Sequence, residues 1–136
     1  MGDILVRDLR YSTLEDFLND NDFFVEKASE NILKVNRSQE QPVYLNRKDN
    51  TIYFSLDLGS VKDLGSESLY FKLLDLNTEI LPVSIGIDTT EESNPRLVLL
   101  ESRECVNMDR NELLSVFDAL EIAVDKIEGL LSEFVK

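Results

Sequence analysis

The chain has 136 residues, of which 43 % are hydrophobic and 30 % are charged, a composition typical of a folded protein and not of a disordered one. The 27 acidic and 14 basic residues give a net charge of −13, so binding to nucleic acid or to anionic lipid is not expected. A single cysteine excludes a disulfide within the chain.

We expect one domain over residues 1–136, in which residues 1–11 form a loosely attached N-terminal segment. This segment lacks the basic start and long apolar run of a secretory signal. Charged residues interrupt every longer apolar stretch, so no segment is expected to span a membrane. Together with the single cysteine, these features predict a cytoplasmic protein without direct membrane insertion.

The first predicted element is a short helix, with Ser12 or Thr13 as its N-cap and its end near residues 19–22. Acidic residues in its first turn favour a helix N-terminus. Residues 23–25 are an apolar group, which we expect in the core at a connection between helix and strand.

Three alternating segments follow and predict strands over residues 32–36, 42–46 and 51–58. Residues 47–50 predict a tight turn between the last two strands, because Asp and Asn tolerate turn conformations. The three strands predict an antiparallel meander.

A second helix is predicted after Ser66, which can act as its N-cap. Two further strands are predicted over residues 82–88 and 96–105. The continuous apolar run at residues 97–100 favours burial on both faces and a central place in the sheet. The apolar residues assigned to one face of the second helix are Leu69, Tyr70, Leu73, Leu74 and Leu76.

A long terminal helix is predicted from Asp109, which with Glu112 forms an aspartate version of the capping box, to about Val135. The breadth of its apolar surface between Leu113 and Ile127 predicts packing on the protein's own sheet. Gly129 weakens the helix near its end. We therefore predict an interface with another subunit at the residues beyond it: Leu130, Leu131, Phe134 and Val135.

The predicted fold is α+β, a two-layer sandwich in which helices cover one side of an antiparallel sheet of about five strands. The predicted order of elements is α-β-β-β-α-β-β-α.

No catalytic signature accompanies this fold. The chain has no histidine, which removes the commonest general base and most zinc sites. Its five glycines form neither a dinucleotide-binding motif nor a P-loop. Glu91 with Glu92, or Asp57 with Asp63, are the carboxylates available for an acid and base pair. We predict no catalytic, cofactor-binding or metal-binding residue.

Two family resemblances follow from these elements. Their order and the acidity of the chain resemble the type III secretion chaperones, small proteins that dimerise and bind partner segments. LPVSIGID at residues 81–88 and LEIAVDKIEGLLSEFVK at 120–136 resemble the YjfI-like bacterial family of unknown function, and this similarity runs from about Thr13 to Lys136. The second resemblance implies a cytoplasmic protein encoded beside a relative of phage-shock protein A, a coiled-coil membrane-remodelling protein. The first implies a homodimer.

The leading hypothesis is a non-enzymatic, acidic binding, adaptor or chaperone-like protein, in which the sandwich of sheet and helices presents apolar grooves rimmed by carboxylates to a partner helix or extended segment. The implied partner is a phage-shock-protein-A-like protein, and the implied assembly is a homodimer. The alternative is a small enzyme that depends on carboxylates or on a divalent metal ion.

Overall fold

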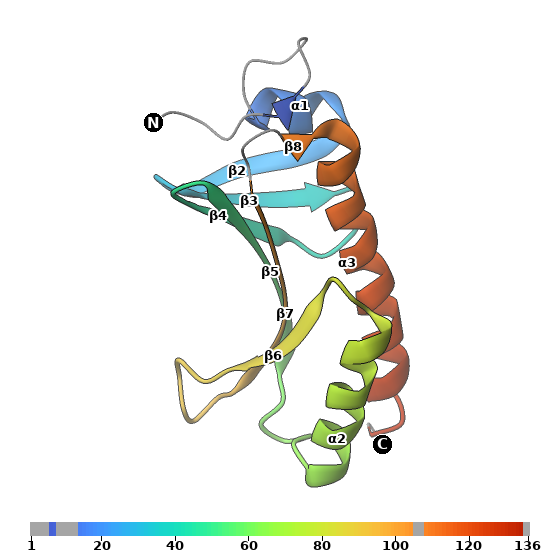
Figure 1. The fold of residues 1–136 in the computed structure, drawn as a ribbon. Coiled ribbons are helices and arrows are strands. Elements are labelled where there is room, and N and C mark those ends of the chain that lie inside the picture. The colour runs from blue at the N-terminus through green and yellow to red at the C-terminus, as the bar shows by residue number, and fades with distance from the viewer. Residues whose placement is uncertain (1–5, 8–13, 105–107, 135–136) are drawn as a thin grey trace. The chain divides into compact units, whose positions relative to one another are not determined.

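A computed structural model describes residues 6–7, 14–104 and 108–134. The chain forms two compact units: unit 1 contains residues 1–56 and 101–117, and unit 2 contains residues 57–100 and 118–136. The residue ranges of three elements include residues of both units, namely β5 (Thr51–Ser60), β7 (Arg96–Glu104) and α3 (Arg110–Leu131), and Figure 1 labels each of them. The expectation of a single domain stays a prediction.

The fold is α+β, as predicted, and its main sheet is antiparallel with the strand order β2-β3-β4-β5-β7-β6. This sheet has six strands, not the five expected from the sequence. A separate pair of short parallel strands joins β1 (Val6–Arg7) to β8 (Met108–Asp109). The remaining strands of the main sheet are β2 (Phe23–Ser29), β3 (Ile32–Arg37), β4 (Val43–Lys48) and β6 (Ser84–Asp88).

The additional strand is β2, at one edge of the sheet. The sequence analysis assigned its first residues to a connection between helix and strand, which was wrong. Phe23 is buried, as expected of a core residue, but Phe24 points to the opposite face and is 68 % exposed. Phe23 is the one fully buried residue of this strand, because an edge strand is largely exposed, and the register shifts between Lys27 and Ser29. The alternation that marks a half-buried strand is therefore too short to detect.

Unit 1 has an aromatic core in which Phe117 of α3 contacts the sheet. The ring centroids of Phe117 and Phe23 are 4.6 Å apart, and the Phe54 ring lies edge-on at 6.0 Å. The Arg37 guanidinium covers this cluster, 5.0 Å from the Phe23 centroid. Helix α1 (Leu14–Asp20) buries three apolar residues on one face: Leu14, Phe17 and Leu18.

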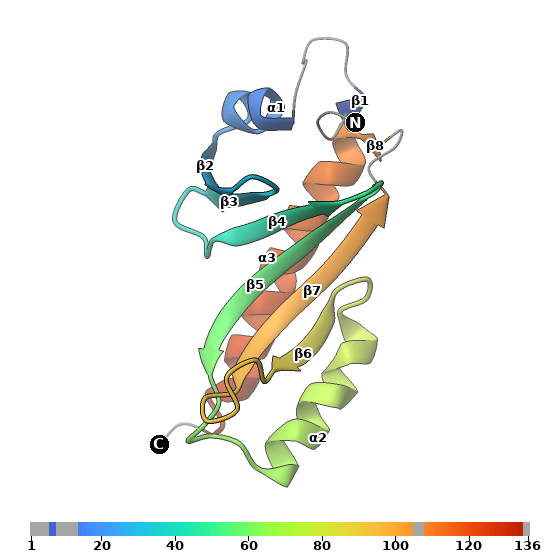
Figure 2. The ribbon, with the colours of Figure 1, turned by 90° about the vertical axis from the view of Figure 1, so that its left-hand side faces the viewer.

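Unit 2 combines β6 and the first part of β7 with helix α2 (Glu67–Leu76), the short helix η1 (Asn77–Glu79) and the second part of α3. Figures 1 and 2 show α2 beside this part of α3, on the same side of β6 and β7. The buried residues of this unit come mostly from its helices, with fewer from β7 and from the connecting segments: Val61, Leu69, Leu73, Ile80, Val83, Leu97, Leu99, Leu120, Ala123, Val124 and Ile127.

Strand β7 has an interior place in the strand order, as predicted, but only one of its faces is buried. Leu97 and Leu99 are buried, whereas Leu100 points to the other face and is 44 % exposed. The prediction of burial on both faces was wrong because the helices described for unit 2 lie on one side of this strand (Figure 2).

Helix α3 begins as predicted, because the Oδ1 atom of Asp109 accepts a hydrogen bond of 2.8 Å from the backbone N–H of Glu112. It ends at Leu131, four residues before the predicted end. Its buried residues agree with the predicted packing against the protein's own core: Leu113, Val116, Phe117, Leu120, Ala123, Val124 and Ile127.

Candidate functional site

The most prominent surface feature of unit 2 is on α2. The helix begins at Ser66, whose hydroxyl accepts a hydrogen bond of 3.1 Å from the N–H of Leu69. Leu69 and Leu73 lie four residues apart, face inward and are buried. Because 3.6 residues complete one turn, this narrow buried stripe turns the neighbouring apolar residues outward.

Three large apolar residues of α2 are exposed in consequence. Phe71 is 73 % exposed, Leu74 is 68 % exposed and Tyr70 is 38 % exposed. We call these three residues the α2 face. A single exposed apolar residue needs no explanation, but three on successive turns of one helix indicate a surface that contacts another molecule. Leu81, which follows η1, is 72 % exposed in the same unit.

The sequence analysis missed the α2 face. It assigned Tyr70 and Leu74 to the same helical face as Leu69, which was wrong because Leu69 is buried and the other two are exposed, and it did not select Phe71. The helical spacing of Leu69, Leu73 and Leu76 was the signal that could have separated the two groups, since it defines a stripe that excludes the other three residues.

Negative charge surrounds this face. Glu67 and Asp75 are exposed on α2, and the helix has one cation, Lys72. The Nζ atom of Lys72 lies 3.3 Å from the Oε1 atom of Glu133. Unit 2 as a whole has thirteen acidic and five basic residues. The α2 face therefore combines an apolar centre with an acidic surround, which suits a protein surface and not an anionic ligand.

Strand β6 provides a second feature of unit 2, an open strand edge. Among the described residues β6 pairs with β7 alone, so its other edge is free of a strand. The Oδ1 atom of Asn77 accepts a hydrogen bond of 2.7 Å from the backbone N–H of Ile85, which occupies one donor of that edge. Ile87, two residues further on, is 41 % exposed.

The predicted interface at the end of α3 lies partly outside the described residues, because Val135 is not among them. Leu130, Leu131 and Phe134 are each half-buried, and Leu131 is the last residue of the helix. The Phe134 ring contacts the chain's own Lys72, whose Nζ atom lies 5.6 Å from the ring centroid. The role of these four residues in an interface stays a prediction.

The structure does not bring the carboxylates of the enzyme alternative together into a metal site. Among the described residues, no group of three or more Cys, Asp and Glu side chains is placed to hold a metal ion. Glu91 and Glu92 are exposed in the turn between β6 and β7.

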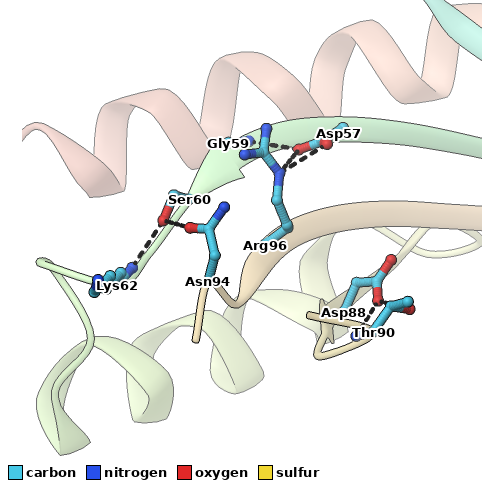
Figure 3. Close-up of polar contacts among 8 residues, drawn as sticks. All are labelled: Asp57, Gly59, Ser60, Lys62, Asp88, Thr90, Asn94 and Arg96. Carbon is cyan, nitrogen blue, oxygen red and sulfur yellow. Dashed lines mark hydrogen bonds and ion pairs between the residues drawn. The ribbon is translucent and has the colours of Figure 1, made fainter. Parts of the chain in front are cut away.

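Asp57, near the end of β5, uses its carboxylate to hold neighbouring segments together by hydrogen bonds. Its carboxylate accepts hydrogen bonds from the Nε atom of Arg96, at 2.9 Å and 3.2 Å, and from the N–H of Gly59 at 2.8 Å (Figure 3). Gly59 has a φ of +115°, a conformation that L side chains rarely adopt, so the glycine permits this backbone conformation near the end of β5. A further bond from the N–H of Val61 to the carbonyl of Pro95 holds the end of β5 to the segment before β7.

Asp88, at the end of β6, is also held by a turn (Figure 3). Its Oδ1 atom accepts hydrogen bonds from the Thr90 hydroxyl at 2.6 Å and from the Thr90 N–H at 2.9 Å. These bonds, the hydroxyl first, lower the pKa of the Asp88 carboxyl below its ordinary value. An exposed carboxylate with a lowered pKa is a poor general base at neutral pH.

Glu101 of β7 is a buried carboxylate in unit 1. Its Oε2 atom accepts a hydrogen bond of 2.7 Å from the Nε atom of Arg103. Its Oε1 atom is buried without a hydrogen-bond partner. The Arg103 side chain is 31 % exposed, so the pair lies at the margin of the core.

No helix of the described chain is both long and apolar enough to cross a membrane.

Comparisons with known proteins give a family and a fold. The family model CesT_Tir_1 matches residues 8–136. A chain in the heterodimeric ExoU–SpcU complex from the type III secretion system of Pseudomonas aeruginosa is similar in structure, with a TM-score of 0.68 and 18 % identity over 87 % of this chain and 97 % of that one. YbjN from E. coli has a TM-score of 0.62 and 19 % identity over 98 % of both chains. A search of curated protein sequences found no significant match.

Proposed function

Since the chain belongs to the CesT_Tir_1 family of type III secretion chaperones, we propose that it is a non-enzymatic chaperone-like adaptor that binds a partner protein as a homodimer. The secretion-chaperone-like fold predicted from the order of elements is confirmed by the family match and the two similar structures. One of those structures is a complex of two different proteins, which supports a role in binding a partner.

The α2 face is the single observation that carries this proposal. Phe71 and Leu74 together expose a large apolar area on one helix, where a chain without a partner would favour polar residues. Covering such residues with a second chain contributes roughly 1.5–3 kcal/mol for each side chain that becomes fully buried. We assign this face to self-association.

Charge and symmetry support a second copy as the occupant. Two α2 helices that pack antiparallel about a point between Phe71 and Leu74 place the Phe71 of each copy beside the Leu74 of the other. The same arrangement places Glu67 directly opposite Thr78 and Asp75 directly opposite Tyr70, so no acidic residue of α2 lies directly opposite another. The pairing therefore joins apolar surfaces without opposing like charges, as a symmetric interface requires.

The end of α3 is the competing surface for self-association. Leu130, Leu131, Phe134 and Val135 were assigned to it from sequence, and the half-buried state of the first three leaves them apolar area to offer a partner. Substitutions at Leu131 and Phe134 distinguish this surface from the α2 face, as described in the Discussion.

For the partner protein we propose a phage-shock-protein-A-like coiled-coil protein, following the resemblance of residues 81–88 and 120–136 to the YjfI-like family. A helix with a basic side suits the negative charge of this chain. We also keep the cytoplasmic location as part of the proposal. Nothing in the described carboxylate geometry favours the enzyme alternative.

Two experiments test partner binding. The tagged chain is used to recover proteins from its native cytoplasm at low salt, and a purified phage-shock-protein-A-like protein is titrated into the purified chain by calorimetry. We expect saturable binding that weakens with added salt, because the proposed attraction is partly electrostatic. If no protein is recovered above background and the titration shows no heat of binding, the proposed adaptor function is wrong.

A further inference from the structure

Unit 1 has a small hollow, with a volume of about 70 Å³, beside the turn that joins β2 to β3. The first turn of α1, the turn itself and the strands β2, β3 and β4 contribute to its lining. Two apolar and four charged residues are among those that line it: Leu14, Leu33, Glu15, Lys27, Glu30 and Arg47.

The two cations reach this hollow from the inward face of the sheet. Lys27 is directly opposite Leu33, and Leu33 is directly opposite Leu45, which is buried. Arg47 lies two residues beyond Leu45 on β4 and therefore projects from the same face. Its backbone N–H donates a hydrogen bond of 3.1 Å to the carbonyl of Asn31, which holds it against the turn. Lys27 and Arg47 thus approach the hollow from the two sides of β3.

The opposite charges that line the hollow do not neutralise one another. Among the residues that the structure describes, the side chains of Lys27, Glu15 and Glu30 form no ion pair or hydrogen bond. A simple anion in the hollow would meet two carboxylates, and a simple cation would meet two bases, so each would be opposed by charge of its own sign. A molecule that has both charges suits the lining better than either.

We propose that this hollow binds a small zwitterion, a free α-amino acid of about the size of glycine or alanine. Its carboxylate is bound by Lys27 and by Arg47, whose planar group of N–H donors matches the geometry of a carboxylate. Its ammonium group donates hydrogen bonds to Glu15 and Glu30. The site is separate from the α2 face, and it depends neither on self-association nor on the partner protein.

The volume of the hollow sets the size of the amino acid. One water molecule needs a space of roughly 10–15 Å³. A hollow of about 70 Å³ therefore accommodates a molecule of only a few non-hydrogen atoms, about the size of glycine or alanine. Leu14 and Leu33 provide the apolar part of the lining, which suits the methyl group of alanine.

An NMR titration of the full chain, labelled with ¹⁵N, tests the proposal. L-alanine is compared at equal concentrations with acetate, ethylamine and N-acetyl-L-alanine, which carry the carboxylate alone, the ammonium alone and the carboxylate beside a neutral amide. We expect L-alanine to shift the amide signals of Lys27, Asn31 and Arg47 saturably. We expect each of the other three probes to bind at least about tenfold more weakly, because each loses charge-assisted hydrogen bonds.

Three variants locate the site. Arg47→Gln should weaken the binding of L-alanine at least about tenfold, since it removes the paired donors to the carboxylate. Lys27→Gln should weaken it severalfold and leaves the half-buried Arg47 in place, so it decides the matter if Arg47→Gln does not fold. The matched control is Lys34→Gln, which should bind as wild type does, because Lys34 adjoins Leu33 in β3 and so lies on the other face of the sheet.

Four results would overturn the proposal. The first is the absence of a saturable shift with L-alanine. Acetate that binds as tightly as L-alanine would show an anion site only, and N-acetyl-L-alanine that does so would show a site for the C-terminus of a peptide. A folded Lys27→Gln variant that binds L-alanine as wild type does would place the binding elsewhere. None of these results bears on the adaptor function, which calorimetry with the partner protein decides.

Discussion

The ammonium group of Lys72 lies 5.6 Å from the centroid of the Phe134 ring and 3.3 Å from the carboxylate of Glu133. These contacts join α2 to the residues that follow α3, inside unit 2. An aromatic residue that the sequence assigned to an intermolecular interface therefore has a contact within its own chain. Both side chains of the Lys72–Glu133 ion pair are exposed to solvent, so this ion pair contributes little to stability.

Substitution at the end of α3 separates two candidate surfaces for self-association. For Leu131→Asp and Phe134→Asp we expect a loss of at most about 1 kcal/mol in the free energy of unfolding. Leu131 and Phe134 are only half-buried, and the contact between Lys72 and the Phe134 ring is solvent-exposed. We also expect unchanged sedimentation. A folded monomer would show that the end of α3 is the interface, and global unfolding would place these residues in the core.

The two adjacent phenylalanines at the start of β2 provide a matched test of the unit 1 core. Phe23→Ala removes a buried ring that contacts Phe117, and the expected loss is about 3–5 kcal/mol in the free energy of unfolding. Phe24→Ala removes a ring that is 68 % exposed, and the expected change is within about 0.5 kcal/mol. Urea denaturation measures both. Equal losses would contradict the assignment of the two residues to opposite faces of an edge strand.

The Glu101–Arg103 pair tests the energetics of a buried carboxylate. Arg103→Ala leaves Glu101 buried and without its hydrogen bond of 2.7 Å, and we expect a loss of about 1–3 kcal/mol. Adding Glu101→Leu should restore most of that stability, because the unpaired charge is then gone. Arg96→Ala is the control, since it breaks an exposed pair and should cost no more than about 1 kcal/mol. Equal effects of the two arginine substitutions would be incompatible with the burial of Glu101.

The hydrogen bonds of Asp88 predict how the stability of the fold depends on pH. Hydrogen bonds from Thr90 hold the pKa of the folded Asp88 carboxyl below its unfolded value. The bonds therefore stabilise the fold at pH values above the ordinary pKa of an aspartate, and this stabilisation is lost as the pH falls through the lowered pKa. We expect Thr90→Val to raise the pKa of Asp88 in an NMR titration and Thr89→Val to leave it unchanged. A pKa of Asp88 that does not respond to Thr90→Val would show that the hydroxyl bond is absent in solution.

The fold class and most of the helices and strands follow from hydrophobic periodicity. Helix α3 was predictable because its buried residues recur at helical spacing from Leu113 to Ile127, and because Asp109 marks its start. Strand β2 was not, since an edge strand buries few side chains and its sequence resembles a loop after Val25. Edge position is a property of the assembled sheet and has no local signal.

The candidate surface was harder to predict than the fold. Tyr70, Phe71 and Leu74 resemble core residues in the sequence, and only the position of α2 against its neighbours decides which apolar residues remain outside. The sequence therefore indicated a protein-binding role through acidity and missing catalytic residues, and it located the interface on α3. The exposed residues of α2 became apparent when the burial of Leu69 and Leu73 fixed the orientation of that helix.

The state of association of an α2-face variant tests the central claim most directly. Wild type, the double variant Phe71→Asp/Leu74→Asp and the control Phe24→Asp are compared by analytical ultracentrifugation, with circular dichroism to verify folding. Phe24 is a fair control because its exposure of 68 % is close to the 73 % of Phe71, in the other unit. We predict that wild type and the control sediment as dimers and that the double variant is a folded monomer. A double variant that sediments as wild type does, or a monomeric wild type, would contradict the account.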